Sequence, residues 1–186
     1  MKITIKKYFF ITLFLLLPIF SEAQQEETEF FLQNISVTKI TSDGENLWLA
    51  TNGNGIFELN LKTQKIIEHS SHTEDLQIDF FHSIAVNKDF VWAGSIDGLF
   101  TYDKKRNTWR KRKFAVGGEM GNWIRSLCYD KKENILWIGR FKNLTQLDIK
   151  RQKFTEYDLT KNNDPKTNTI KTIKLDGDSL VWFGSE

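Results

Sequence analysis

The chain has 186 residues, of which 40% are hydrophobic, with 26 Lys and Arg against 24 Asp and Glu. Residues 1–23 carry Lys2, Lys6, Lys7 and Glu22; without them 23 basic and 23 acidic residues remain, and this balance gives no field that would steer nucleic acid or an anionic membrane to the protein. The single cysteine, Cys128, excludes a disulfide within one chain, and in a predicted inner strand it is expected to be a small buried apolar residue.

The chain begins with a predicted signal peptide, residues 1–23. Three lysines precede the apolar stretch 8–20, which is too short to span a bilayer comfortably, and Ser21-Glu22-Ala23 offers a cleavage site. The pattern predicts an exported protein, periplasmic or extracellular, and an uncleaved anchor is the alternative. Residues 24–36 contain Phe30-Phe31-Leu32, which reads as an N-terminal strand that could clasp a closed ring.

A tryptophan motif recurs through the rest of the chain. Its four copies are Leu47-Trp48-Leu49-Ala50-Thr51, Val91-Trp92-Ala93-Gly94-Ser95, Leu136-Trp137-Ile138-Gly139-Arg140 and Val181-Trp182-Phe183-Gly184-Ser185. The tryptophans are 44, 45 and 45 residues apart. A period in the forties with strand-like apolar runs is typical of a β-propeller, in which each repeat forms one small sheet.

Each repeat reads as four strands joined by polar turns, so the fold class is predicted to be all-β, a propeller of four-stranded blades. The expected blades are 37–80, 81–123, 124–169 and a truncated 170–186. Inner strands are predicted near 37–42, 82–87, 124–130 and 170–176, and tryptophan strands near 46–51, 90–95, 135–139 and 180–184. No helix of three or more turns is expected beyond residue 30.

The propeller arrangement leads to two further expectations about how neighbouring blades pack. The tryptophan strands are nearly continuously apolar, as strands buried on both faces are, so Trp92 and Trp137 should be mostly buried. A small residue follows each tryptophan by two positions: Ala50, Gly94, Gly139 and Gly184. We expect this residue to leave room for a bulky neighbour, such as an indole of the adjacent blade.

The fourth repeat breaks off after its tryptophan strand, which leaves about three and a half blades. Because closed propellers have four to eight blades, the chain is expected to be the N-terminal part of a longer protein.

These repeats resemble the two-component regulator propeller repeat. The resemblance rests on the Leu-Trp-Ile-Gly-Thr-like motifs, on Gly98-Leu99-Phe100-Thr101-Tyr102-Asp103 and on Phe154-Thr155-Glu156-Tyr157, and it covers residues 37–186. The third repeat departs from the pattern, with Arg140 for Thr or Ser and Phe141-Lys142-Asn143 for the Gly-rich turn. Asn143 keeps the demand for a left-handed backbone, since Asn is the common substitute for Gly there.

The sequence offers little chemistry. It has no phosphate loop, nucleophile elbow or Cys-x-x-Cys, so no catalytic residue, metal ligand or cofactor is predicted, and the ligand-binding residues stay unassigned. His69, His72 and His82, with Glu74 and Asp75 between them, could suggest a metal site, but a solvated loop is the preferred interpretation. The basic run Arg110 to Lys113 is interpreted as a charged edge strand, with an anion-binding patch as the alternative.

The resemblance implies a non-catalytic sensor. Such propellers usually form the extracytoplasmic half of a membrane histidine kinase that responds to carbohydrate breakdown products. The expected partner is a small molecule such as an oligosaccharide, held by rim loops 70–79, 115–122 and 160–168. No nucleic acid is expected, the membrane would be reached only through segments after residue 186, and the full-length protein could form a homodimer. The alternatives are a scaffold propeller of a secretion or cell-surface assembly and an exported lyase or glycosidase.

Overall fold

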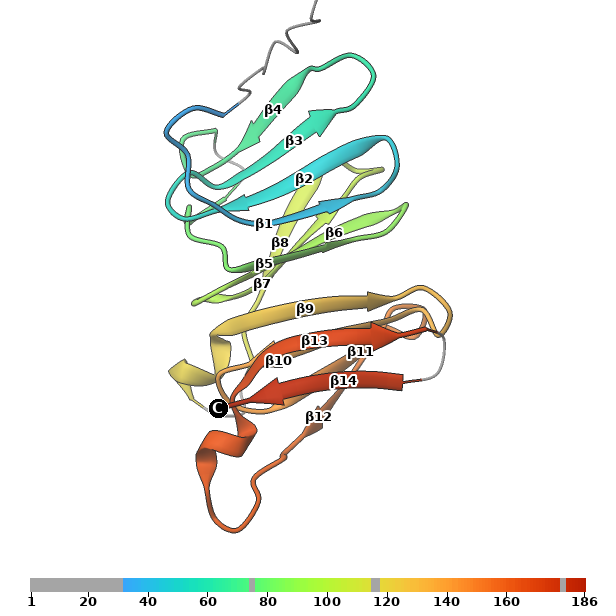
Figure 1. Cartoon of the computed structure of the whole chain (residues 1–186). Helices are drawn as coiled ribbons and strands as arrows, with labels where there is room; N and C mark the ends of the chain where they lie inside the picture. Colours follow the sequence, from blue (N-terminus) through green and yellow to red (C-terminus); the bar gives the residue numbers. More distant parts are fainter. Residues whose placement is uncertain (1–31, 74–75, 115–117, 178–179) are drawn as a thin grey trace, which may run out of the picture. The chain divides into compact units, whose positions relative to one another are not determined.

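A computed structural model describes residues 32–73, 76–114, 118–177 and 180–186 (Figure 1). The chain divides into two units, Met1–Gln33 and Asn34–Glu186, and the strands of the described residues belong to the second unit. The predicted signal peptide and residues 24–31 of the predicted N-terminal strand lie outside the described residues.

The second unit consists of consecutive antiparallel sheets, each formed by strands that follow one another in the chain. Blade 1 contains β1 (Val37–Ser42), β2 (Asn46–Thr51), β3 (Ile56–Asn60) and β4 (Ile66–His69). Blade 2 contains β5 (Ser83–Val86), β6 (Phe90–Ser95), β7 (Gly98–Asp103) and β8 (Thr108–Arg112). Blade 3 contains β9 (Ile124–Asp130), β10 (Ile135–Arg140), β11 (Leu144–Asp148) and β12 (Lys153–Tyr157). A fourth sheet contains β13 (Ile170–Asp176) and β14 (Leu180–Ser185).

This arrangement confirms the all-β propeller fold, with three four-stranded blades and a fourth sheet of two described strands. In the described residues the only helical elements are two short 3₁₀ turns, η1 (Glu119–Asn122) and η2 (Pro165–Asn168). No helix in this part of the chain is both long and apolar enough to cross a bilayer.

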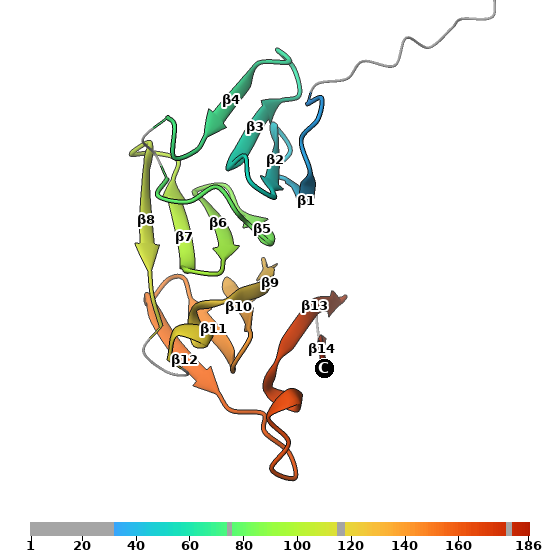
Figure 2. The ribbon, with the colours of Figure 1, turned by 90° about the vertical axis from the view of Figure 1, so that its left-hand side faces the viewer.

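The inner strands bring successive sheets together. β5 contacts both β1 and β9, and β9 contacts β13, so the first strand of each sheet packs beside the first strand of the next. Figure 2 shows these strands together on one side and the outer strands β4, β8 and β12 on the other. β8 has a mostly exposed charged surface, which confirms the interpretation of Arg110 to Lys113 as an edge strand.

Each tryptophan of the repeat is the third residue of its strand, and Trp48 and Trp92 pack toward the following blade. Trp48 is fully buried and its ring centroid lies 5.8 Å from that of Tyr102 in blade 2. Trp92 is 2% exposed and lies 5.7 Å from Tyr129 in blade 3, as expected. Trp137 is mostly buried too, although less completely, beside a sheet with two described strands, and Trp182 is 61% exposed.

In blades 2 and 3 the glycine two residues after the tryptophan makes room for an isoleucine, which corrects the expectation of an indole. A Cβ on Gly94 would collide with the side chain of Ile124, at the start of the next inner strand, and with Ser83 Oγ. A Cβ on Gly139 would collide with Ser126 Oγ and would lie 2.8 Å from Ile170 Cγ2. Glycine therefore lets consecutive inner strands approach closely.

Cys128 lies in β9 as predicted but is only partly buried. Burial raises the pKa of its thiol, which keeps the group protonated at neutral pH.

Candidate ligand-binding site

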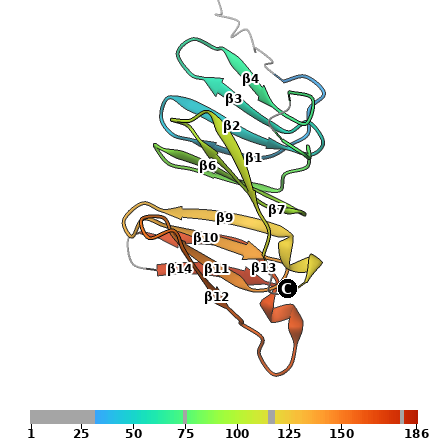
Figure 3. The same ribbon diagram turned by 180° about the vertical axis from the view of Figure 1, so that it is seen from behind.

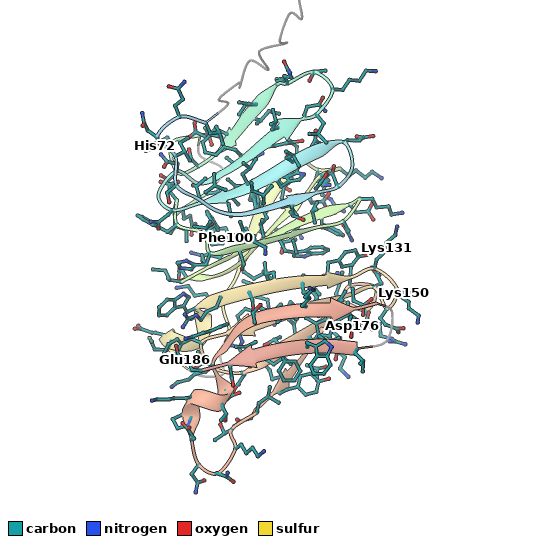
Figure 4. All side chains as sticks on the ribbon, in the orientation of Figure 1. His72, Phe100, Lys131, Lys150, Asp176 and Glu186 are labelled. Carbon is teal, nitrogen blue, oxygen red and sulfur yellow. The ribbon has the colours of Figure 1, made fainter. Side chains whose placement is uncertain are left out.

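All connections between blades emerge at one end of the sheets, which we call the loop end. The pairing of Val37 with Thr51 and of Ile56 with His69 places the start of β1, the β2–β3 hairpin and the end of β4 together. Figure 3 shows η1 and η2 at this end, and Figure 4 shows His72 and Glu186 there, with Lys131, Lys150 and Asp176 at the opposite end.

Hydrogen bonds join the blade connections to the hairpins of the loop end. The backbone N–H groups of Gly53 and Gly55 donate to the Asp79 carbonyl at 3.0 and 2.9 Å. In blade 3 the Asn143 N–H donates to the Asn168 carbonyl at 3.0 Å, and the Asn168 amide donates to Asn143 Oδ1 at 2.7 Å. Asn143 has φ 72°, which confirms the predicted left-handed backbone. These hydrogen bonds fix the loops to the sheets, so the loops can hold side chains in defined positions for binding.

One residue is inserted into the inner strand at this end of the sheets. The register shifts between Val37 and Lys39, at the start of β9 and between Ile170 and Thr172. The extra residues are Thr38, Arg125 and Lys171. A β-bulge of this kind disrupts the ladder locally and redirects the side chain. His82, whose N–H donates to the Gly94 carbonyl at 2.8 Å, holds the corresponding place just before β5.

An aromatic pair stands beside these bulges. The rings of Trp123 and Phe141 are stacked, with centroids 5.3 Å apart and an interplanar angle of 4°. The Phe141 N–H donates to the Trp123 carbonyl at 2.8 Å, and Thr169 Oγ1 donates to the Phe141 carbonyl at 2.8 Å. The guanidinium carbon of Arg125 lies 5.2 Å from the Trp123 ring centroid, within cation–π range. The stack therefore helps to orient the Arg125 side chain.

The bulge residues of β9 and β13 carry positive charge. Arg125 Nη1 lies 3.5 Å and Lys171 Nζ 2.9 Å from the same oxygen, Glu186 Oε1. Lys171, and then Arg125 and Lys166, lower the pKa of the Glu186 carboxyl. The side chains stay accessible, with 26% of Arg125 and 46% of Lys171 exposed.

His82 contributes a neutral polar group next to this charge. Its ring lies 5.9 Å from Trp123. Burial, and then the positive charge of Arg125, lower its pKa, so the imidazole is uncharged at neutral pH. Its buried Nε2 has no hydrogen-bond partner among the described residues.

Arg140 ties the blade 2–3 connection to blade 3. Its buried guanidinium pairs with Glu156, and it donates to Thr145 Oγ1 at 2.9 Å and to the Gly121 carbonyl at 2.8 Å. In blades 1 and 2 the corresponding Thr51 and Ser95 bond to their own hairpins instead. The departure from the repeat pattern therefore gives blade 3 a link to the loop before Trp123.

A shallow hollow of about 420 Å³ lies over the blade 2 hairpin, within the usual size range for small ligands. Its wall includes the exposed side chains of Phe80 and Ile96. Lys113 Nζ pairs with Asp97 Oδ1 at 2.8 Å on the same wall. The loop end thus offers an apolar surface besides the charged one.

The three expected rim loops emerge at the loop end, although residues 74–75 and 115–117 of two of them are not described. The three histidines lie in different settings. His69, the last residue of β4, is 4% exposed and stacks on Trp48 at 5.9 Å, so it is not part of a solvated loop. His72 lies in the turn that follows. Within the described ranges, which omit Glu74 and Asp75, no group of three metal-ligating side chains gathers.

The sequence interpretation missed Trp123, Arg125 and Lys171. A signal was present: alignment of Ile124-Arg125-Ser126 with Ile170-Lys171-Thr172 puts a basic residue at the same position of two apolar strands. Trp123 is also one of the two tryptophans that fall outside the period.

Comparison with known proteins confirms the resemblance to two-component sensor propellers. No family model matches the sequence. The histidine kinase P4 of Formosa agariphila is 30% identical over an alignment of 157 residues, and the match covers 75% of this chain and 11% of the kinase.

Two solved structures have the same fold; both are extracellular domains of proteins from B. thetaiotaomicron that are described as hybrid two-component systems. One has a TM-score of 0.64 with 23% identity, over 81% of this chain and 19% of that domain. The other has a TM-score of 0.69 with 24% identity, over 87% of this chain and 21% of that domain. The chain therefore spans about a fifth or less of the length of each of these relatives.

Proposed function

We propose that these blades belong to an exported, ligand-sensing propeller of a two-component signalling protein and catalyse no reaction themselves. The similarity to a histidine kinase over most of this chain carries the proposal. The fold shared with extracellular domains of two-component systems supports a position outside the cytoplasm.

The ligand is a small molecule such as an oligosaccharide, and it binds at the loop end. The aromatic pair Trp123–Phe141, the polar His82 and the charged Arg125 and Lys171 provide the mixture of apolar and convergent polar groups that small-ligand sites use. The signal passes to a kinase portion that lies outside these blades.

Phosphotransfer in the full-length protein tests this function. The protein is reconstituted in liposomes, and phosphorylation is followed while a panel of oligosaccharides is added to the extracytoplasmic side. We expect one class of oligosaccharide to change the phosphorylation level. Trp123→Ala should abolish the response, whereas Lys150→Ala, at the opposite end of blade 3, should preserve it.

Two results would favour the alternative functions. Unchanged phosphorylation together with stable co-purification in an outer-membrane assembly would favour a scaffold. Turnover of an oligosaccharide that a single carboxylate substitution abolishes would show an enzyme.

A further inference from the structure

Two cations share one carboxylate at the loop end. Arg125 of β9 and Lys171 of β13 both approach Glu186 Oε1, at 3.5 and 2.9 Å. Two like charges on neighbouring strands repel each other, and an anion between them removes this cost. Among these three side chains, two positive charges face one negative charge.

The backbone determines the positions of the Arg125 and Lys171 side chains. Each is the inserted residue of its inner strand, and the bulge directs both side chains to the same side of the sheets. The contact of Arg125 with the Trp123 ring adds a second constraint, since the ring is itself stacked on Phe141. A guanidinium held in this way can form paired, charge-assisted hydrogen bonds to a carboxylate.

Three other basic residues of the loop end pair with carboxylates elsewhere. Arg140 is fully buried against Glu156, and Lys111 and Lys113 pair with Asp97 on the outer side of blade 2. The carboxylate that faces Arg125 and Lys171 is partly exposed, since 33% of the Glu186 side chain is accessible.

We propose that Arg125 and Lys171 form an anion subsite that receives a carboxylate of the sensed ligand, an acidic oligosaccharide of the uronide class, in place of the Glu186 carboxylate. The inference rests on the proposed sensing function and specifies its ligand. Glu186 acts as an internal competitor that occupies the subsite until the ligand arrives.

Binding of matched sugars to the whole chain tests the subsite. The probes are trisaccharides of galacturonate, glucuronate and mannuronate, each compared by calorimetry with the neutral trisaccharide of the same linkage. We expect at least one uronide to bind about tenfold or more tightly than its neutral counterpart, as hydrogen bonds to charged groups predict.

Three substitutions separate the subsite from general attraction between charges. Arg125→Gln should weaken uronide binding about tenfold or more and leave binding of the neutral sugar unchanged. Glu186→Gln should strengthen uronide binding, because the competing charge is removed. Lys150→Gln, which removes an equal charge at the opposite end, should change neither. Circular dichroism melts establish that each variant is folded.

The outcomes distinguish this inference from the proposed function. Equal binding of uronides and neutral sugars, or uronide binding that Arg125→Gln does not weaken, would overturn the subsite. If a neutral sugar also drives phosphotransfer in the full-length protein, sensing stands without the subsite. If a uronide binds through Arg125 but phosphotransfer never responds, the subsite stands and sensing is wrong. Binding of no sugar would reject both.

Discussion

Lys104 Nζ of blade 2 lies 2.6 Å from Asp43 Oδ2 of blade 1, so an ion pair crosses the interface between the blades. The same carboxylate oxygen accepts a hydrogen bond from Trp48 Nε1 at 3.0 Å. Its other oxygen accepts the N–H groups of Glu45 and Asn46 at 3.0 and 2.8 Å. Only 9% of the Asp43 side chain is exposed. One carboxylate therefore caps the turn after β1, orients the repeat tryptophan and holds the next blade.

This relationship predicts a loss of stability in acid. Burial by itself raises the pKa of Asp43, but the hydrogen bonds from Lys104, Asn46, Trp48 and Glu45 outweigh burial and lower it from 3.8 to about 2. Because the folded pKa is below the unfolded one, the stabilisation is complete above about pH 4 and disappears as the pH falls toward 2. The full shift corresponds to an upper limit of about 2 kcal/mol, which screening by solvent reduces.

Urea unfolding of the wild type and Asp43→Asn at pH 7, 4 and 2 measures this effect. The free-energy difference between the two proteins should shrink between pH 4 and pH 2. Asp89→Asn changes an exposed carboxylate in the next blade and serves as the control. A difference that is independent of pH would contradict the role of the Asp43 charge.

Gly94, which follows Trp92 by two residues in blade 2, should not tolerate replacement by a residue with a side chain. Gly94→Ala puts a Cβ into the Ile124 side chain and Ser83 Oγ, and overpacking of this kind typically costs about 1–3 kcal/mol. Gly184→Ala is the matched control, because its Cβ would meet only Thr172 Cγ2, at 3.0 Å. Chemical denaturation should show a clear loss for the first variant and a smaller one for the second. The cost of Gly94→Ala should fall in an Ile124→Ala background, and strict additivity would contradict the packing explanation.

The contribution of each repeat tryptophan to the free energy of unfolding should depend on how far the neighbouring blade buries it. Trp48→Ala and Trp92→Ala remove fully or almost fully buried indoles and should each cost about 3–5 kcal/mol. Trp182→Ala should cost far less in this chain, since 61% of that side chain is exposed. Thermal melts of the three variants compare the costs. Equal losses for Trp92 and Trp182 would contradict the view that the next blade supplies the burial.

The Arg140–Glu156 pair should respond asymmetrically to substitution. Glu156→Gln leaves a guanidinium that is 0% exposed without its counter-charge, and breaking a buried pair typically costs about 3–5 kcal/mol. Arg140→Met should cost less, because 29% of the Glu156 side chain is exposed and water can solvate the remaining carboxylate. Urea unfolding gives both costs. Hydrogen exchange at residues 118–123 should rise in both variants, since Arg140 holds the Gly121 carbonyl.

Repeating local patterns made most of the fold predictable. The tryptophan motif, the polar turns and the left-handed positions at Gly55, Gly98 and Asn143 recur at one spacing, so every strand was expected within a few residues of its place. Trp137 is mostly buried, as expected, but less completely than Trp92, because the extent of burial depends on the size of the neighbouring sheet, which a motif does not report.

The candidate site was hidden because its residues become neighbours only in three dimensions. Trp123 and Phe141 are separated by a whole hairpin, and Arg125 and Lys171 by a full repeat. The sequence Ile124-Arg125-Ser126 does not by itself indicate a β-bulge, because an inserted residue can be identified only from its pairing with the partner strand.

Alternation of apolar strands and turns is a local property, so the chain alone specified its blades, their order and the small residue beside each tryptophan. The contact of neighbouring inner strands is a property of the assembled sheets. Only that contact decided that an isoleucine fills the space at Gly94, that Arg140 is buried against Glu156, and that two basic bulge residues converge on Glu186.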